Sequence, residues 1–197
     1  MAGRFIALEG GDGCGKSTQA RLLAEAIGAR LTREPGGTPA GERMREIVLD
    51  PATGELDLHS EVLLYAASRA EHVAKVIRPT IEAGEDLVCD RFIASSLAYQ
   101  GHGRQLVVED VAWINDWGTG GLRPDLTILV DVPVDVAVQR MDRDLDRLEA
   151  VSEDFRQRVV DGYRAMAEDG GWAVVDGSGT IEDVFTLVLA AYVERLG

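Results

Sequence analysis

Five short segments of strand length alternate along the chain with stretches in which apolar residues recur at helical spacing. Four of these segments are apolar runs with almost no polar interruption, which is typical of strands buried on both faces of a parallel sheet, and the fifth, 30–34, is more polar. Because helical stretches separate the runs, the pattern predicts an α/β fold with a five-stranded parallel sheet flanked by helices. The expected strands cover residues 5–8, 30–34, 87–89, 126–130 and 172–175.

Apolar residues at helical spacing fill the intervals between these runs. The first such stretch places Leu23 and Ile27 on one face, and Gly28 is suited to end that helix. Near the C-terminus, Thr180 followed by Asp183 is close to a capping box and predicts the start of the last helix. The other expected helices cover residues 44–48, 58–77, 94–100, 106–117, 134–141 and 152–168.

Composition limits the kind of partner. The 197 residues suit one domain, 1–197, and the net charge of −14 argues against a nucleic-acid-binding surface. No apolar run approaches the roughly 20 residues that a membrane-spanning helix needs, and the first run is too short for a signal peptide. The two cysteines, Cys14 and Cys89, form no disulfide framework. We therefore expect a cytoplasmic protein that binds neither nucleic acid nor membrane.

The most informative stretch follows the first expected strand. Residues 10–17, Gly-Gly-Asp-Gly-Cys-Gly-Lys-Ser, fit the phosphate-loop pattern G-x-x-x-x-G-K-[ST] between a strand and a helix. Glycines allow positive φ and close approach of a phosphate, and the helix N-terminus attracts the anion. Lys16 is expected to reach the β- and γ-phosphates, and Ser17 to ligate Mg²⁺. The expected nucleotide-binding residues are Gly10, Gly11, Asp12, Gly13, Cys14, Gly15, Lys16, Ser17 and Thr18.

Charged residues close the expected strands. Ligands of parallel sheets bind beyond the carboxyl ends of the strands, so these residues are expected to share one rim. Arg91 is better suited to hold a phosphate there than to be a surface arginine. Asp90 fits two roles equally: a water-mediated contact to Mg²⁺, or the N-cap of the next helix. The strand-end residues are Glu9, Arg33, Glu34, Asp90, Arg91, Asp131 and Asp176.

Five segments together resemble the thymidylate kinase family over nearly the whole chain. The loop alone indicates only a P-loop NTPase, whereas the segments at 33–38 and 90–101 are far more specific. The resemblance implies a three-layer P-loop NTPase fold that transfers the γ-phosphoryl group of Mg·ATP to dTMP, giving dTDP in dTTP biosynthesis. The segments are 5–10 with the loop, Arg-Glu-Pro-Gly-Gly-Thr at 33–38, Leu-Tyr-Ala-Ala-Ser-Arg at 64–69, Asp-Arg-Phe…Ser-Ser…Ala-Tyr-Gln-Gly at 90–101, and Arg-Pro-Asp-Leu-Thr at 123–127 with Asp-Arg-Leu-Glu at 146–149.

The resemblance also implies how the nucleoside of dTMP is recognised. Arg69 is implied to hydrogen-bond the thymine, Tyr65 to stack on its ring and Ser96 to contact the base edge. Tyr99 is implied to crowd the 2′ position and so to favour deoxyribose. A flat aromatic side chain suits a base, and a bulky one excludes a hydroxyl group.

Catalysis is implied to rest on charge neutralisation. Arg45 and Arg91 hold the dTMP phosphate, and Asp12 sits between that phosphate and the metal. The acceptor is already an oxyanion, so no general base is needed. Lys16, Arg91, Mg²⁺ and one further arginine are expected to neutralise the charge between the two anions.

The further arginine is expected in a short lid at about 140–151. Composition alone favours an exposed, salt-bridged loop for its alternating charges, whereas nucleotide kinases need a mobile lid there. Some thymidylate kinases carry an arginine inside the phosphate loop, but this chain has none at 11–14. Arg143 and Arg147 are therefore the catalytic candidates, and Arg140 stays open as a third.

Alternatives from other classes remain at this point. The nearest is a P-loop kinase for another nucleoside monophosphate or a small metabolite. A GTP-dependent switch is disfavoured because no lysine follows an asparagine, so the Asn-Lys-x-Asp guanine motif is missing. An inactive homologue is disfavoured because no motif residue is visibly lost. The three histidines, His59, His72 and His102, are expected to be structural or exposed.

The family likeness further suggests a homodimer. Apolar faces of the helices near 58–77 and 106–117 could supply its interface. Three tryptophans, Trp113, Trp117 and Trp172, are expected in the core or in such an interface.

Overall fold

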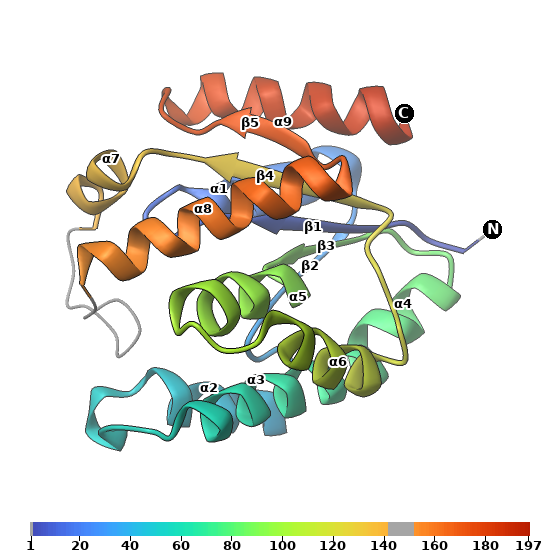
Figure 1. The fold of residues 1–197 in the computed structure, drawn as a ribbon. Helices are drawn as coiled ribbons and strands as arrows, with labels where there is room; N and C mark the ends of the chain where they lie inside the picture. The colour runs from blue at the N-terminus through green and yellow to red at the C-terminus, as the bar shows by residue number, and fades with distance from the viewer. Residues whose placement is uncertain (1, 142–151) are drawn as a thin grey trace.

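The computed structural model describes residues 2–141 and 152–197, so most of the predicted lid, with Arg143 and Arg147, lies outside the described residues. A sheet of order β2-β3-β1-β4-β5 forms the centre, and all its neighbouring strands are parallel. Helices cover both faces (Figure 1). The predicted fold class is therefore confirmed. The strands are β1 (Phe5–Glu9), β2 (Arg30–Arg33), β3 (Leu87–Asp90), β4 (Leu126–Asp131) and β5 (Ala173–Asp176).

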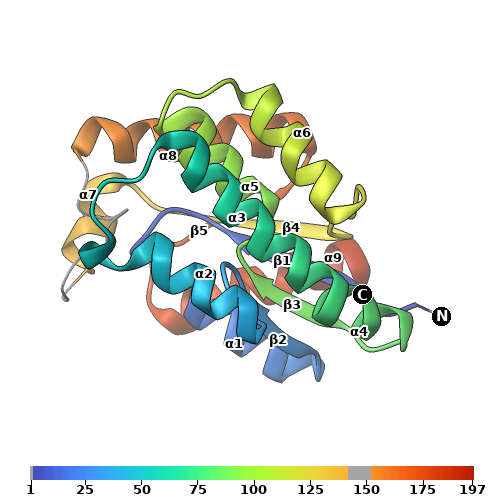
Figure 2. The ribbon, with the colours of Figure 1, turned by 90° about the horizontal axis from the view of Figure 1, so that it is seen from below.

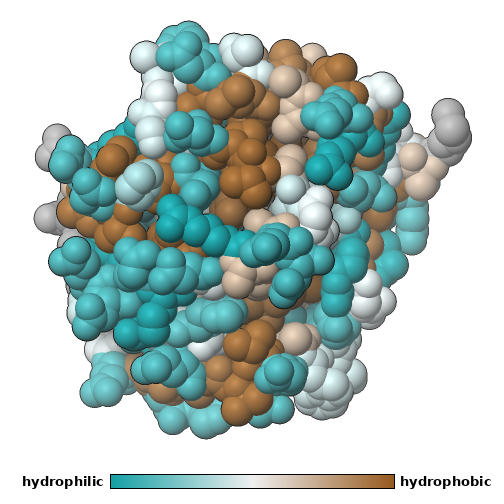
Figure 3. Space-filling view, turned by 45° about the horizontal axis from the view of Figure 1, so that its top comes forward, coloured by the Kyte–Doolittle hydropathy of each residue, from teal (hydrophilic) through white to brown (hydrophobic). Residues whose placement is uncertain are grey.

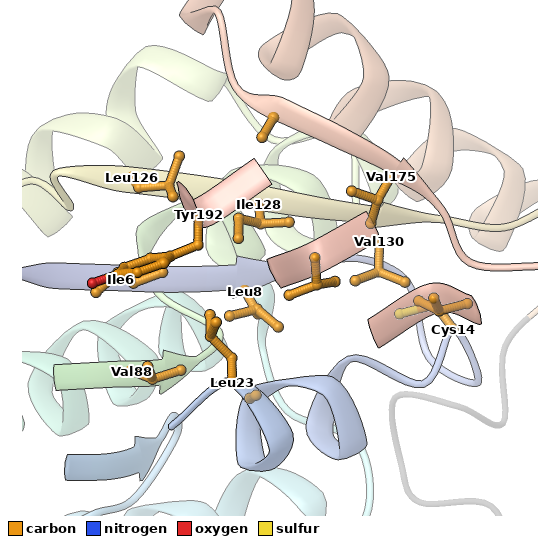
Figure 4. Close-up of a cluster of buried hydrophobic side chains, with 14 of the residues drawn as sticks. Ile6, Leu8, Cys14, Leu23, Val88, Leu126, Ile128, Val130, Val175 and Tyr192 are labelled. Atoms are coloured by element: carbon orange, nitrogen blue, oxygen red, sulfur yellow. The ribbon is translucent and has the colours of Figure 1, made fainter. Parts of the chain in front are cut away.

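Alternate residues of β1 enter apolar cores on opposite faces of the sheet. Ile6 and Leu8 pack with α1 (Lys16–Ile27) and α9 (Ile181–Leu196), and Figure 4 shows this cluster. Phe5 and Ala7 belong to a second core with residues of the helical segments on the other face. Because both faces are covered, β1 is buried throughout, as its uninterrupted apolar run predicts.

The remaining helices surround the sheet, and two of the predicted caps are present. Gly28 ends α1 in the left-handed conformation, with φ 68°. The Thr180 hydroxyl accepts a hydrogen bond from the Asp183 N–H at 3.2 Å at the start of α9. Seen from below, α3 lies between α2 and α6 (Figure 2). The remaining helices are α2 (Pro39–Leu49), α3 (Leu58–His72), α4 (Arg78–Glu82), α5 (Ile93–Ser96), α6 (Val108–Thr119), α7 (Val134–Gln139) and α8 (Glu153–Gly170), with a 3₁₀ turn at Pro51–Thr53.

Two of the predicted helices contain π-helical segments that their periodicity did not predict. Val73–Ile77 joins α3 to α4, and Leu97–Gly103 continues α5. Pro79 stands in the first turn of α4, directly after the π-helical segment, in a helical stretch that continues from α3 without a break. Single π-helical turns are frequent at functional sites. The segment after α5 carries Tyr99, one of the predicted substrate-binding residues.

The surface keeps some apolar side chains exposed. With the top of Figure 1 turned forward, Figure 3 shows a band of hydrophobic residues flanked by hydrophilic ones. Val174, on the edge strand β5, is among the exposed large apolar residues. None of the helices in the described ranges combines the length and the apolar character needed to cross a bilayer.

Candidate active site

The phosphate loop joins β1 to α1 in a conformation that requires glycine. Gly13 has φ 80° and Gly15, the residue before α1, has φ 89°. Side chains are disfavoured at both positions by this left-handed backbone. A Cβ on Gly13 would also lie 2.3 Å from the carbonyl oxygen of Ala137. The loop therefore ends at the N-terminus of α1, where an anion is stabilised by the helix dipole and by backbone N–H groups.

A cavity of about 590 Å³, here called the loop cavity, lies between the phosphate loop and the segment after β5. Arg140 stands at its edge and donates to the carbonyl oxygens of Gly177 at 2.8 Å and Ser178 at 2.9 Å. Arg140 is thus tied to the segment after β5. The predicted nucleotide-binding residues that line the loop cavity are Asp12, Gly13, Cys14, Gly15, Lys16, Ser17 and Thr18.

A second cavity, of about 350 Å³, is here called the inner cavity. It shares Asp12, Lys16 and Ser17 with the loop cavity, so the two adjoin at these side chains. Every predicted substrate-binding residue lines it, although they come from α2, α3, α5, the π-helical segment after α5 and the turn after β3. These residues are Arg45, Tyr65, Arg69, Arg91, Ser96 and Tyr99.

Asp12 lies between two cations where the cavities meet. Arg91 Nη2 donates to Asp12 Oδ1 at 2.5 Å, and Lys16 Nζ lies 3.8 Å from the same oxygen. The Tyr99 hydroxyl donates to Asp12 Oδ2 at 2.6 Å. Burial by itself would raise the pKa of the Asp12 carboxyl, but Arg91 and Lys16 lower that pKa below its ordinary value. Asp12 is therefore a carboxylate that holds both cations at the junction.

Arg91 is fixed by buried groups, of which the sequence placed only Glu9 near it, at the same rim of the sheet. The Glu9 carboxylate accepts from the Phe92 N–H at 2.8 Å and from the Ser95 hydroxyl at 2.7 Å. Arg91 Nη1 donates to Ser95 Oγ and to the Tyr163 hydroxyl, both at 3.0 Å. Burial raises the pKa of Glu9, and the hydrogen bond from Ser95 offsets part of that rise. Together these groups hold Arg91 in a left-handed backbone conformation with φ 73°.

Arg69 is the other buried arginine of the inner cavity. Its Nε donates to Glu34 Oε2 at 2.6 Å, and Nη2 donates to the carbonyl oxygen of Phe92 at 3.0 Å. Its Nη1 donates to Ser96 Oγ at 2.9 Å and to Asn115 Oδ1. Asn115 comes from α6, and the sequence offers no signal for it because a single asparagine in a helical pattern matches no motif.

The match to known proteins agrees with this geometry. The thymidylate kinase family model matches residues 8–188. The thymidylate kinase of Exiguobacterium sibiricum is 47% identical over 94% of this chain and 92% of its own length. The thymidylate kinase of Desulforudis audaxviator is 48% identical over 89% of this chain and 84% of its own length. The thymidylate kinase of Lactobacillus helveticus is 40% identical over 100% of this chain and 98% of its own length. The chain belongs to the thymidylate kinase family. It is a phosphotransferase that phosphorylates dTMP with ATP as the donor, and the alternative acceptors are not favoured.

For Asp90 of this kinase, the sequence predicted either the N-cap of the next helix or a water-mediated contact to Mg²⁺. The N-cap prediction is wrong, because Phe92 is the N-cap of α5 and no side chain caps that helix. Asp90 Oδ1 is buried and accepts no hydrogen bond from any residue in the described part of the chain. Asp90 lines the inner cavity together with Ser17. A buried carboxylate oxygen without a donor, in a cavity that a hydroxyl group also lines, is an arrangement that fits a hydrated cation.

His72 is a structural histidine, as the sequence predicts. Its Nδ1 lies 3.0 Å from Glu34 Oε1, and its Nε2 lies 2.7 Å from Thr32 Oγ1. Cys89 is close enough to complete a possible ligand group with Glu34 and His72. Burial first and then the Glu34 carboxylate raise the pKa of the Cys89 thiol well above its ordinary value. In the thymidylate kinase, His72 holds Glu34, which in turn pairs with Arg69.

Proposed function

We propose that dTMP binds in the inner cavity and ATP in the loop cavity, so that the two phosphate groups meet beside Asp12, Lys16 and Arg91. The observation that supports this most directly is that Asp12, Lys16 and Ser17 line both cavities. One kinase domain, 1–197, then carries both sites. The two buried free thiols suit the reducing cytoplasm in which we place the enzyme.

Phosphoryl transfer at this junction needs cations rather than a base. The attacking phosphate oxygen of dTMP is already ionised, so the protein's task is to hold two anions in line and neutralise their charge. Arg45 and Arg91 bind the acceptor phosphate, and Lys16 binds the β- and γ-phosphates. Asp12 keeps Lys16 and Arg91 at the meeting point. We assign the remaining positive charge to Arg143 or Arg147, which lie outside the described residues.

We propose Mg²⁺ as the divalent metal that accompanies ATP. Ser17 would ligate it through the hydroxyl group and Asp90 through a water molecule, since oxygen ligands suit this ion. When bound there, Mg²⁺ supplies charge neutralisation at the phosphates. The Oδ1 of Asp90, which has no hydrogen-bond partner among the described residues, supports this assignment.

The sugar assignment is tested by Tyr99→Ala. Tyr99 is buried, lines the inner cavity and is held by its hydrogen bond to Asp12. Removing the ring makes room for a 2′-hydroxyl, so the preference for dTMP over ribothymidine 5′-monophosphate, measured as a kcat/KM ratio, is expected to fall about tenfold or more. Tyr99→Phe keeps the ring and is expected to keep the preference. An unchanged ratio in Tyr99→Ala would remove Tyr99 as the sugar gate and place the deoxyribose elsewhere.

We propose that a second copy of the chain covers the exposed apolar face of α3 and α6. Trp113 and Trp117 lie one helical turn apart on α6 and are 65% and 74% exposed, so of the two predicted positions, core or interface, the core is excluded for both. Leu63 on α3 and Val107 before α6 are also exposed. Large exposed apolar side chains gathered on packed helices are typical of an interface.

The dimer is tested by Trp117→Glu in sedimentation equilibrium. Burying an unpaired carboxylate in the interface is unfavourable, so the variant is expected to dissociate at least about tenfold more readily than the wild-type chain. Leu187→Glu introduces the same charge at an exposed apolar position on α9 and serves as the matched control. A monomeric wild-type chain, or equal effects of both substitutions, would contradict the proposed interface.

A further inference from the structure

We propose that Asn115 is a positioning residue that fixes Arg69 for reading the thymine base, and so sets the preference for thymine over cytosine. This rests on the proposed binding of dTMP in the inner cavity. Asn115 lies on α6, is 1% exposed and does not line that cavity. Its effect on the substrate is therefore exerted through Arg69.

The orientation of the Asn115 amide is determined by its other contact. Its Nδ2 donates to the carbonyl oxygen of Val111 at 2.7 Å, one turn earlier in α6. Since only the amide nitrogen can donate to a carbonyl oxygen, Oδ1 is the atom that faces Arg69. Asn115 thus presents a fixed acceptor to Nη1 of Arg69.

The contacts of Arg69 leave one donor for a ligand. An arginine side chain has five N–H groups. The Nε N–H reaches Glu34, and the two Nη1 N–H groups reach Ser96 and Asn115. One of the two Nη2 N–H groups reaches the carbonyl oxygen of Phe92. The remaining Nη2 N–H has no acceptor among the residues that the structure describes, and Arg69 lines the inner cavity. Because Asn115 and Ser96 accept both N–H groups of Nη1, the planar guanidinium can offer a ligand only the second N–H of Nη2.

The charge around Arg69 suits a neutral base rather than a phosphate. Glu34 is buried, lies 2.6 Å from Nε and compensates the positive charge of Arg69. A single N–H donor with little net charge selects a hydrogen-bond acceptor. Thymine and uracil present the acceptor O4, whereas cytosine presents an N4 amino group that is itself a donor. The fixed orientation of Arg69 therefore discriminates between the bases at this position.

The test compares dTMP, dUMP and dCMP as acceptors for Asn115→Leu, which is similar in size but lacks the acceptor, and for Asn115→Ala. With Nη1 released, Arg69 can turn, so KM for dTMP is expected to rise about tenfold and the dTMP/dCMP ratio of kcat/KM to fall about tenfold. The dTMP/dUMP ratio, KM for ATP and kcat are expected to stay within about threefold, because uracil keeps O4. Asn115→Asp keeps an acceptor oxygen for Nη1 but loses the amide that donates to Val111, so it isolates the acceptor and is expected to restore the dTMP/dCMP ratio.

Two reference variants separate the possible failures. Thr119→Val removes a buried hydroxyl one turn later on α6 that bonds only helix carbonyl oxygens, so it reports a purely structural loss. The role of Asn115 would be overturned if the Asn115 variants lost kcat/KM equally for all three acceptors. It would also be overturned if both Asn115 variants kept the dTMP/dCMP ratio while Arg69→Lys lowered it. An unchanged ratio in Arg69→Lys itself would instead overturn the proposed contact between Arg69 and the base.

Discussion

Replacing Lys16 by alanine is expected to reduce phosphoryl transfer at least about 10³-fold, because this removes the cation that we propose binds the transferring phosphates. The Lys16 side chain reaches the junction of the two cavities, where Nζ lies 3.4 Å from the Gly11 carbonyl oxygen and 3.8 Å from Asp12. Its ammonium group supports no apolar core, so the fold is expected to persist. A coupled assay of ADP release with Mg·ATP and dTMP measures the loss.

The chain offers a simple control for this experiment. Lys75 is its only other lysine and is exposed on the π-helical segment after α3. Lys75→Ala is expected to keep wild-type turnover within about twofold, as surface substitutions usually do. Near-normal turnover of Lys16→Ala, with thermal unfolding unchanged, would refute the role given to the phosphate loop.

Replacing Arg91 by lysine is expected to lower kcat/KM for dTMP about 10²-fold or more, although the charge is kept. Lysine cannot reproduce the forked contacts of Arg91 with Asp12, Ser95 and Tyr163. For dTMP, kcat is expected to fall and KM to rise, while KM for ATP changes little. Initial rates over a matrix of both substrate concentrations separate these effects.

The pH profile of the Arg91 variant provides a second readout. In the wild-type chain, Arg91 and Lys16 lower the pKa of Asp12 against the opposing effect of burial. A more distant charge at position 91 lets that pKa rise, so the acidic limb of kcat/KM is expected to move to higher pH. Arg164→Ala removes an arginine that pairs with the strand-end residue Asp131 and is expected to leave the profile unchanged. If the acidic limb of kcat/KM did not shift in Arg91→Lys, the titration of Asp12 would not be the cause of that limb.

Several features of the site follow from local sequence because they depend on neighbouring residues. The phosphate loop needs glycines where the backbone has positive φ, and Gly13 and Gly15 stand at two such positions. Arg91 closes a buried strand, and the ends of parallel strands share one edge. The convergence of Glu9, Arg91 and the loop could therefore be predicted, whereas the positive φ of Arg91 could not.

Other features depend on contacts between distant segments. Tyr163 reaches Arg91 from α8, 72 residues later in the chain, and Asn115 reaches Arg69 from α6, 46 residues later. Helical periodicity identifies the buried face of each helix but not the residue opposite it in another helix. It also does not distinguish an α-helical from a π-helical turn: the pattern predicts ordinary helix over residues 94–100, whereas Leu97–Gly103 is π-helical.

Local patterns were enough for the α/β class, the phosphate loop and the types of residue that we propose gather around the two phosphates. These are local properties, since the alternation of strands and helices and the spacing of the glycines depend on consecutive residues. Which side chains hold the two arginines depends on tertiary contacts: Ser95, itself bound to Glu9, and Tyr163 hold Arg91, and Glu34 and Asn115 hold Arg69. These contacts depend on the order β2-β3-β1-β4-β5 and on how the helices pack against it, which no local pattern specifies.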